Sequence, residues 1–159
     1  LETNNDDIAY VTQTTLSMDD TKKIIDCLTK KYPDIKSPAK DDICYATQNR
    51  QDAVNSIIKY CDFLVVIGSK NSSNSKRLAE LGMKNNIPSI LIDDKSDLDI
   101  NVLKDKKVVG ITAGASAPEI IFTDVLDYLT NLGAVIEDFD NEDRIENITF
   151  SLPKELREL

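Results

Sequence analysis

Four short loops are rich in small hydroxyl and amide side chains, and each stands where a strand pattern gives way to a helix pattern. They are residues 12–15, 44–49, 69–75 and 114–118. In a parallel α/β sheet all such junctions lie on the edge where the strands end, which is where ligands bind. Each junction also presents a helix N-terminus with unpaired N–H groups and a positive dipole end. The pattern therefore indicates an anion-binding site made largely of neutral donors.

Helix capping alone explains any one of these loops, because Ser, Thr and Asn are the residues favoured at helix starts. A cap needs one side chain, however, and the run Ser72-Ser73-Asn74-Ser75 offers four. Four such loops on one edge favour a binding site. None of them ends in the Gly-Lys-Ser/Thr of a P-loop or has the Gly-x-Gly-x-x-Gly spacing of dinucleotide-binding folds. These residues alone leave the ligand open.

The three cysteines offer a second kind of chemistry. Their odd number argues against a disulfide framework, and the absence of histidine excludes a self-contained Ser-His-Asp or Cys-His site. Cys27 and Cys61 lie on apolar helical stripes, so we predict that both are buried core thiols. Cys44 precedes a helix N-terminus, where the dipole lowers a thiol pKa, and its context fits a ligand, a reactive thiol or a structural residue. One cysteine cannot hold an iron–sulfur cluster, which needs three or four thiolates.

The elements that must position these residues alternate between strands and helices, which is typical of an α/β fold with a Rossmann-like parallel or mixed sheet and helices on both faces. Strands are predicted at residues 8–11, 63–67, 89–92, 108–112, 134–136 and 148–152. Helices are predicted from the N-cap Ser17 to residue 31, along the stripe of Val54, Ile57, Ile58 and Cys61, and at residues 76–85 and 119–131. Gly133 is the expected C′ residue of the last helix. Residues 35–42, which follow Pro33 and contain Pro38, are the expected linker.

Size and charge narrow the class of protein. The chain has 159 residues, 41% of them hydrophobic, which suits one domain or two small subdomains. Its net charge of −9 argues against a nucleic-acid partner. It contains no apolar run near the roughly 20 residues of a membrane span, and its acidic start does not resemble a signal peptide. We therefore expect a cytoplasmic protein without a membrane partner, and the missing initiator Met suggests a fragment or a processed chain.

Taken together, the loops resemble the LytB family of 4-hydroxy-3-methylbut-2-enyl diphosphate reductases. The matching segments are TQTTLS at residues 12–17, DDICYATQNRQ at 41–51, GSKNSSNS at 68–75, GITAGASAP at 110–118 and FSLPKEL at 150–156. They follow the family's order and spacing and cover nearly the whole chain. The resemblance implies part of an arrangement of three α/β subdomains around a central cluster. Residues 1–40 would end the second subdomain, 41–132 would form the third, and 133–159 would return to the rest of the enzyme.

The resemblance also implies roles for individual residues. Cys44 would be the last of three cysteine ligands of a [4Fe–4S] cluster, the other two lying upstream of this chain. Thr14 would stand beside the substrate's hydroxyl and relay a proton from a glutamate in the missing half. Thr47 and Asn49 would shape the cluster pocket. The residues that would hold the diphosphate are Ser72, Ser73, Asn74 and Ser116.

The implied reaction removes the hydroxyl of 4-hydroxy-3-methylbut-2-enyl diphosphate to give isopentenyl and dimethylallyl diphosphate, in the non-mevalonate isoprenoid pathway. Ferredoxin or flavodoxin would be the electron donor, and the complete enzyme is expected to be a monomer. With one cluster ligand and half a pocket, this chain is expected to be inactive without the N-terminal half. Two alternatives stay open. One is a non-enzymatic diphosphate-binding α/β module, and the other is a thiol redox protein that uses Cys44, although no resolving cysteine is evident.

Overall fold

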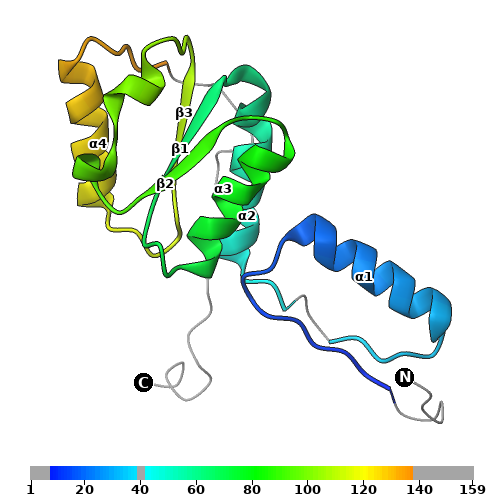
Figure 1. The fold of residues 1–159 in the computed structure, drawn as a ribbon. Coiled ribbons are helices and arrows are strands. Elements are labelled where there is room, and N and C mark those ends of the chain that lie inside the picture. Colours follow the sequence, from blue (N-terminus) through cyan, green and yellow to red (C-terminus); the bar gives the residue numbers. More distant parts are fainter. Residues whose placement is uncertain (1–7, 39–41, 138–159) are drawn as a thin grey trace, which may run out of the picture.

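A computed structural model describes residues 8–38 and 42–137, which form an α/β unit and a smaller N-terminal part that extends from one end of it (Figure 1). The helices are α1 (Met18–Lys31), α2 (Tyr45–Ile57), α3 (Ser73–Lys84) and α4 (Glu119–Asn131). The strands are β1 (Phe63–Ile67), β2 (Ser89–Ile92) and β3 (Val109–Ala113). Short 3-10 helices are η1 (Ile58–Tyr60), η2 (Lys95–Asp97) and η3 (Ile100–Leu103). The predicted α/β class is confirmed.

The sheet is parallel, with strand order β2-β1-β3. Val65 in the central strand stands between Ile90 of β2 and Ile111 of β3. All five residues of β1 are buried, as a central strand covered on both faces requires. The uninterrupted apolar run at residues 63–67 reflects that burial.

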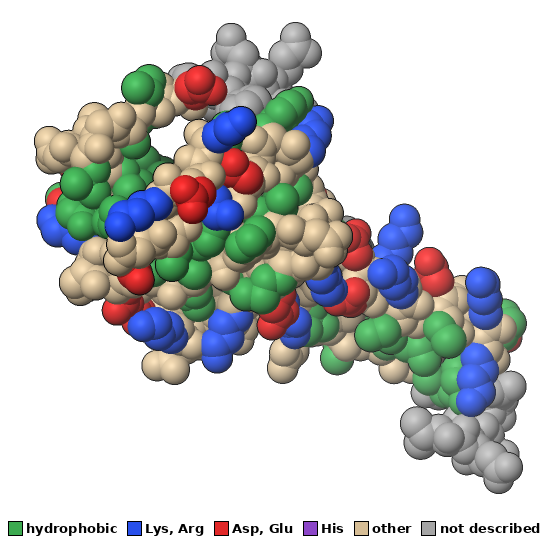
Figure 2. Space-filling view, turned by 45° about the horizontal axis from the view of Figure 1, so that its top comes forward, with side chains coloured by type: hydrophobic (Ala, Val, Ile, Leu, Met, Phe, Trp, Pro, Cys, Tyr) green, Lys and Arg blue, Asp and Glu red, His purple; other side chains and the backbone are tan. Residues whose placement is uncertain are grey.

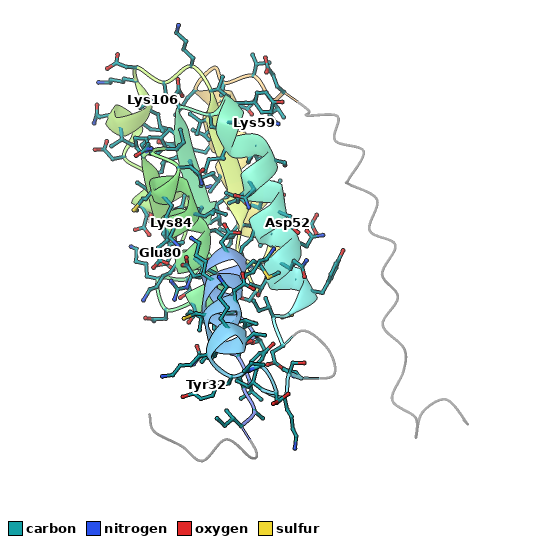
Figure 3. All side chains as sticks on the ribbon, turned by 90° about the vertical axis from the view of Figure 1, so that its right-hand side faces the viewer. Tyr32, Asp52, Lys59, Glu80, Lys84 and Lys106 are labelled. Carbon is teal, nitrogen blue, oxygen red and sulfur yellow. The ribbon has the colours of Figure 1, made fainter. Side chains whose placement is uncertain are left out.

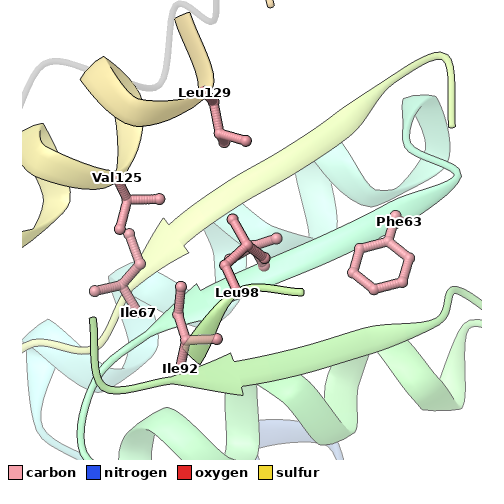
Figure 4. Close-up of a cluster of buried hydrophobic side chains, with 7 residues drawn as sticks. Phe63, Ile67, Ile92, Leu98, Val125 and Leu129 are labelled. Carbon is pink, nitrogen blue, oxygen red and sulfur yellow. The ribbon is translucent and has the colours of Figure 1, made fainter. Parts of the chain in front are cut away.

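Alternate side chains of β1 point to opposite faces of the sheet and belong to two separate hydrophobic cores. On one face, side chains of the sheet pack against α4 and the η2–η3 connection (Figure 4); the buried members are Phe63, Val65, Ile67, Ile92, Leu98, Val125 and Leu129. On the other face they pack against α2, η1 and α3; the buried members are Val54, Ile58, Leu64, Val66, Leu78 and Ala79. Helices thus cover both faces, and burial of this kind stabilises by roughly 1.5–3 kcal/mol for each large apolar side chain.

Local signals at the helix ends explain where the helices begin and end. The Ser17 Oγ accepts a bond from the Asp20 N–H at 3.4 Å and caps α1 as predicted. The Ser72 Oγ does the same for the Ser75 N–H at 3.3 Å, so α3 begins at Ser73, three residues before the predicted start. Gly133, with φ +98°, ends α4, and its N–H donates to the Thr130 carbonyl at 2.9 Å. This is the left-handed terminus that glycine favours.

The N-terminal part differs from the prediction. The expected strand at residues 8–11 makes a single parallel bridge, Ala9 to Lys36, because the described chain offers it no other neighbouring strand. Val11 remains 84% exposed and Ile24 of α1 61% exposed, and Figure 2 shows apolar side chains lying among lysines on this part. Lys84, at the end of α3 (Figure 3), forms an ion pair with Asp20 of α1. Polar contacts therefore contribute much of the attachment of α1.

Of the two strands predicted near the C-terminus, one is absent from the structure and the other lies outside the described residues. Residues 134–136 form no strand, so that prediction is wrong: Val135 and Ile136 are exposed and pair with no strand of the described chain. The predicted strand at 148–152, and with it most of the expected segment 133–159, lies outside the described residues. Within the described ranges, no helix is long and apolar enough to span a bilayer.

Candidate functional site at the end of the sheet

The N-termini of α2, α3 and α4 lie at the same end of the sheet, where the parallel strands terminate (Figure 1). Helices α3 and α4 follow β1 and β3, and α2 runs antiparallel to β1, which it precedes. Three of the four polar loops predicted from the sequence therefore share one edge. The positive ends of three helix dipoles meet there, which suits an anion.

Two glycines let α3 come close to the strand ends. Gly68 follows β1 and Gly114 follows β3; the Gly114 N–H donates to the Ile67 carbonyl at 2.8 Å. A Cβ atom at Gly68 would stand 2.3 Å from the Ser75 Oγ, and one at Gly114 would stand 2.2 Å from it. Real Cβ atoms do not approach other atoms so closely. The Ser75 hydroxyl thus occupies the space that a side chain at either position would need, so both positions require glycine.

The first turn of α3 contains buried polar groups whose bonding is incomplete. Asn74 is 6% exposed and Ser75 1% exposed. The Asn74 Oδ1 and Nδ2 and the Ser75 Oγ have no hydrogen-bond partner within the part of the chain that the structure describes. A buried amide left unpaired costs about 1–3 kcal/mol, so such a group calls for a partner. The Asn74 Nδ2 lies 3.8 Å from where a Gly114 Cβ would be, beside the loop of Ser116.

The serines that were predicted to bind the diphosphate flank Asn74. Ser73 and Ser116 are exposed, and Ser72 is half-buried. The Ser72 oxygen accepts the cap bond from Ser75, which leaves its O–H able to donate. Ser116 lies in a turn closed by the Ala117 N–H bonding the Gly114 carbonyl at 2.9 Å. The four residues therefore come from two neighbouring loops of the same edge.

Lys70 stands in the loop before α3, but acidic residues engage its charge. Its Nζ lies 3.0 Å from the Asp97 Oδ2 and 3.8 Å from the Asp93 Oδ2. The hydrogen bond to Asp97 raises the pKa of Lys70. Its backbone N–H also donates to the Asp93 Oδ1 at 3.3 Å. Lys70 thus ties this loop to the residues that follow β2. The four residues predicted to hold the diphosphate all have uncharged side chains.

Thr14 and Cys44 meet through their backbones. The Cys44 N–H donates to the Thr14 carbonyl at 2.9 Å, although thirty residues separate them in the chain. Cys44 is the N-cap of α2, makes no side-chain cap bond and has an exposed thiol. Thr14 is also exposed. The predicted relay residue and the predicted cluster ligand therefore lie side by side, at the start of a helix.

Comparison with known proteins decides the family. The model of the family described as LytB protein matches residues 1–130. The chain belongs to the LytB family. A relative named 4-hydroxy-3-methylbut-2-enyl diphosphate reductase from Ectopseudomonas mendocina (strain ymp) is 56% identical over 97% of this chain and 49% of its own length. One of the same name from Chromohalobacter salexigens is 52% identical over 99% of this chain and 50% of its own length. The chain thus spans about half the length of the curated relatives it matches.

A solved structure agrees with this assignment. The E-1-hydroxy-2-methyl-but-2-enyl-4-diphosphate reductase from Plasmodium falciparum is 40% identical and superposes with a TM-score of 0.80. The match covers 84% of this chain and 42% of that one. The LytB fold therefore extends over most of the described residues.

The other two cysteines, Cys27 and Cys61, differ in their exposure to solvent. Cys61 is buried as predicted, and its Sγ lies 3.2 Å from the Ile57 carbonyl. Burial, reinforced by the nearby Asp62, raises the pKa of its thiol. The prediction for Cys27 is wrong: its thiol is exposed, because the described chain does not cover that face of α1. No group of three metal-binding side chains of the His, Cys, Asp and Glu types occurs within residues 8–38 and 42–137.

Two residues contribute to this edge in ways that the sequence does not predict. Ser75 belongs to the predicted polar loop, but in the structure its hydroxyl packs between Gly68 and Gly114. Gln51 has no predicted role, yet its buried amide bonds the backbone on both sides of Ser17. Gly68 and Gly114, each directly after a strand, are a sequence sign of the close packing around Ser75. The role of Gln51 depends on contacts with residues 33 and 35 positions earlier in the chain, for which no local sequence pattern exists.

Proposed function

We propose that this chain forms part of a 4-hydroxy-3-methylbut-2-enyl diphosphate reductase and contributes its diphosphate-binding edge and one cluster ligand. The observation that carries the proposal is Asn74, whose amide is buried at a helix N-terminus with both polar atoms lacking a partner among the described residues. LytB relatives at 56% identity support it. A diphosphate oxygen at this point would accept the Asn74 Nδ2–H bond and relieve the cost of the unpaired amide.

Neutral donors can bind the diphosphate here. Ser72 and Ser73 begin α3, and Ser116 comes from the loop after β3. Their hydroxyls and the α3 dipole favour negative charge, and hydrogen bonds to a charged acceptor are worth about 1.5–3 kcal/mol each. Because Lys70 is engaged by Asp97 and Asp93, we assign the recognition of the diphosphate to these donors.

Cys44 fits one position of an iron–sulfur cluster. Its thiol is exposed, makes no cap bond and stands at the N-terminus of α2, so it is available to bind a metal. The described residues offer no complete ligand set, so two further cysteines would come from the rest of the protein. When bound, a [4Fe–4S] cluster supplies electrons and a Lewis-acidic iron. Ferredoxin or flavodoxin is the proposed electron donor.

Thr14 would hold a proton at its hydroxyl. It lies beside Cys44, because its carbonyl accepts the Cys44 N–H. A substrate whose diphosphate binds at Asn74 and whose reacting end lies near Cys44 would bring its hydroxyl to the Thr14 side. The threonine would then pass a proton to the departing oxygen, a role in general acid catalysis.

The test uses the complete protein that contains this chain, reconstituted with iron and sulfide under anaerobic conditions. The expected result is conversion of the hydroxylated diphosphate to isopentenyl and dimethylallyl diphosphate. In parallel, calorimetry measures the binding of inorganic diphosphate. Ser73→Ala should weaken binding about ten- to a hundredfold, the equivalent of one charge-assisted bond. Ser56→Ala is the matched control, since the Ser56 Oγ bonds the Ala53 carbonyl within α2. Equal affinities in the two variants would exclude this diphosphate site.

A non-enzymatic diphosphate-binding module is the second candidate. It is favoured by one observation: Cys44 stands without two further thiol ligands near it in the described part of the chain. The reconstitution experiment separates the candidates. A brown protein that loses its colour on Cys44→Ala supports the reductase, whereas a colourless protein that still binds diphosphate supports the module.

A further inference from the structure

Gln51 links the segment of Thr14 to the helix of Cys44. Its side chain is 5% exposed and lies on α2. The Gln51 Nε2 donates to the Leu16 carbonyl at 2.9 Å, and the Met18 N–H donates to the Gln51 Oε1 at 3.0 Å. The Gln51 amide therefore bonds the carbonyl of residue 16 and the N–H of residue 18. The backbone of a neighbouring β-strand would make the same pair of bonds. No other use of this buried group is evident among the described contacts.

We propose that Gln51 is a positioning residue that fixes the Thr14 hydroxyl relative to the Cys44 thiol. This inference rests on the proposed function, because the distance between the Thr14 hydroxyl and the Cys44 thiol matters only if both groups take part in the reaction. Gln51 stands seven residues after Cys44 on the same helix, which places it on the same face about 10 Å further along. Both residues thus hold the segment that runs past them.

Several bonds fix this segment on both sides of Thr14. The Thr14 carbonyl accepts the Cys44 N–H, and the Thr12 N–H donates to the Asp42 Oδ2 at 2.7 Å. Gln51 holds the following residues, and Ser17 between them caps α1. Thr14 itself is exposed, so burial does not restrain it. Without Gln51, the segment would keep its anchors at residues 12 and 14 but lose the one that fixes its direction after Thr14.

A change at Gln51 should therefore affect the chemical step more than the binding of the diphosphate. Misplacement of a reacting group by about 1 Å can lower a rate by up to about a hundredfold. The residues proposed to bind the diphosphate lie at the start of α3 and in the loop after β3, whereas the Gln51 side chain bonds Leu16 and Met18. A residue with a purely structural role would instead lower the melting temperature and leave the rate of the folded enzyme unchanged.

The experiment compares three variants of the complete, anaerobically reconstituted protein. Gln51→Leu removes both bonds at similar volume. Gln51→Glu keeps the acceptor for the Met18 N–H but, when ionised, sets a carboxylate against the Leu16 carbonyl. Asn55→Leu is the control, an exposed amide one turn further along α2. For each variant we would measure the single-turnover rate, the affinity for inorganic diphosphate, the iron content and hydrogen exchange at the Met18 N–H.

For Gln51→Leu we expect a rate about tenfold or more below the parent, faster exchange at Met18, unchanged iron content and diphosphate affinity within about twofold. A rate equal to that of Asn55→Leu would overturn the proposal. If Gln51→Leu does not fold, Gln51→Glu decides. Burial raises the pKa of a carboxyl, and the protonated form can donate to Leu16, so its rate relative to the parent should rise as pH falls. A pH-independent ratio would contradict the positioning role.

Failure of the proposed function would look different. An inactive, colourless parent protein would remove the reductase assignment, and exchange at Met18 and the adjoining segment would still show whether Gln51 holds it. An active parent with an unaffected Gln51→Leu variant would remove only the positioning role.

Discussion

Replacing Gly114 by alanine tests the close packing at the end of the sheet. The new methyl would lie 2.2 Å from the Ser75 Oγ and 3.4 Å from its Cβ. An ordinary contact of this kind needs more than 3 Å, so the hydroxyl must retreat by about 1 Å or more. Ser75 is 1% exposed and also meets Gly68, which leaves little room for the retreat. Overpacking of this sort costs about 1–3 kcal/mol, and we expect Gly114→Ala to lower the free energy of unfolding by that amount.

Urea unfolding followed by circular dichroism measures the effect, and a second substitution identifies its cause. Ser75→Ala removes the atom at 2.2 Å and leaves the Cβ at an acceptable 3.4 Å. The double variant should therefore regain most of the lost stability. Gly133→Ala is the matched control, because a Cβ there meets nothing within 4 Å and its φ is +98°. It should cost about 1 kcal/mol through backbone strain alone. Equal rescue of both glycine variants by Ser75→Ala, or rescue of neither, would show that the Ser75 hydroxyl does not cause the loss of stability.

Three further predictions concern single residues. Thr14→Val in the complete protein should lower the single-turnover rate much more than diphosphate affinity, and a rate within about threefold of the parent would reduce Thr14 to a structural role. Cys44→Ser should prevent retention of iron, whereas Cys61→Ala should keep iron and cost about 1 kcal/mol or more of stability; iron loss in the latter would reverse the ligand assignment. Backbone N–H groups, that of Lys107 foremost, lower the pKa of Asp62. Its stabilising effect is present above the unfolded carboxyl pKa near 4 and is lost as pH falls further, so Asp62→Asn should flatten the pH dependence of the melting temperature in acid.

The part of the fold that was predictable is the part whose signals are local. The apolar run of β1 and the caps at Ser17 and Gly133 depend on neighbours in sequence, and the structure reproduces them. Cys27 would be buried only if another element covered that face of α1. The helical periodicity of the sequence does not show whether such an element is present. Helix α3 begins three residues earlier than predicted because its first turn is polar, and a polar run is also typical of a loop.

The candidate site, too, could be predicted only in part. The sequence led to Asn74 and Cys44 through the composition of their loops and through resemblance to a family. It could not show that the Asn74 amide lies buried beside Gly114, or that the Cys44 N–H bonds the Thr14 carbonyl. Those contacts join segments that are distant in the chain, so they arise only when the sheet has assembled.

The shallow attachment of α1 has a consequence for the lifetime of this chain in a cell or a lysate. Of the residues of α1, only Thr21 is buried, and a helix with so little buried surface opens locally at small free-energy cost. Proteases cut such open states first. Trypsin should therefore cleave at the exposed Lys22, Lys23, Lys30 and Lys31 well before it reaches the α/β unit. A polypeptide that covers α1 would slow this first cut, so the digestion pattern reports whether the helix is covered.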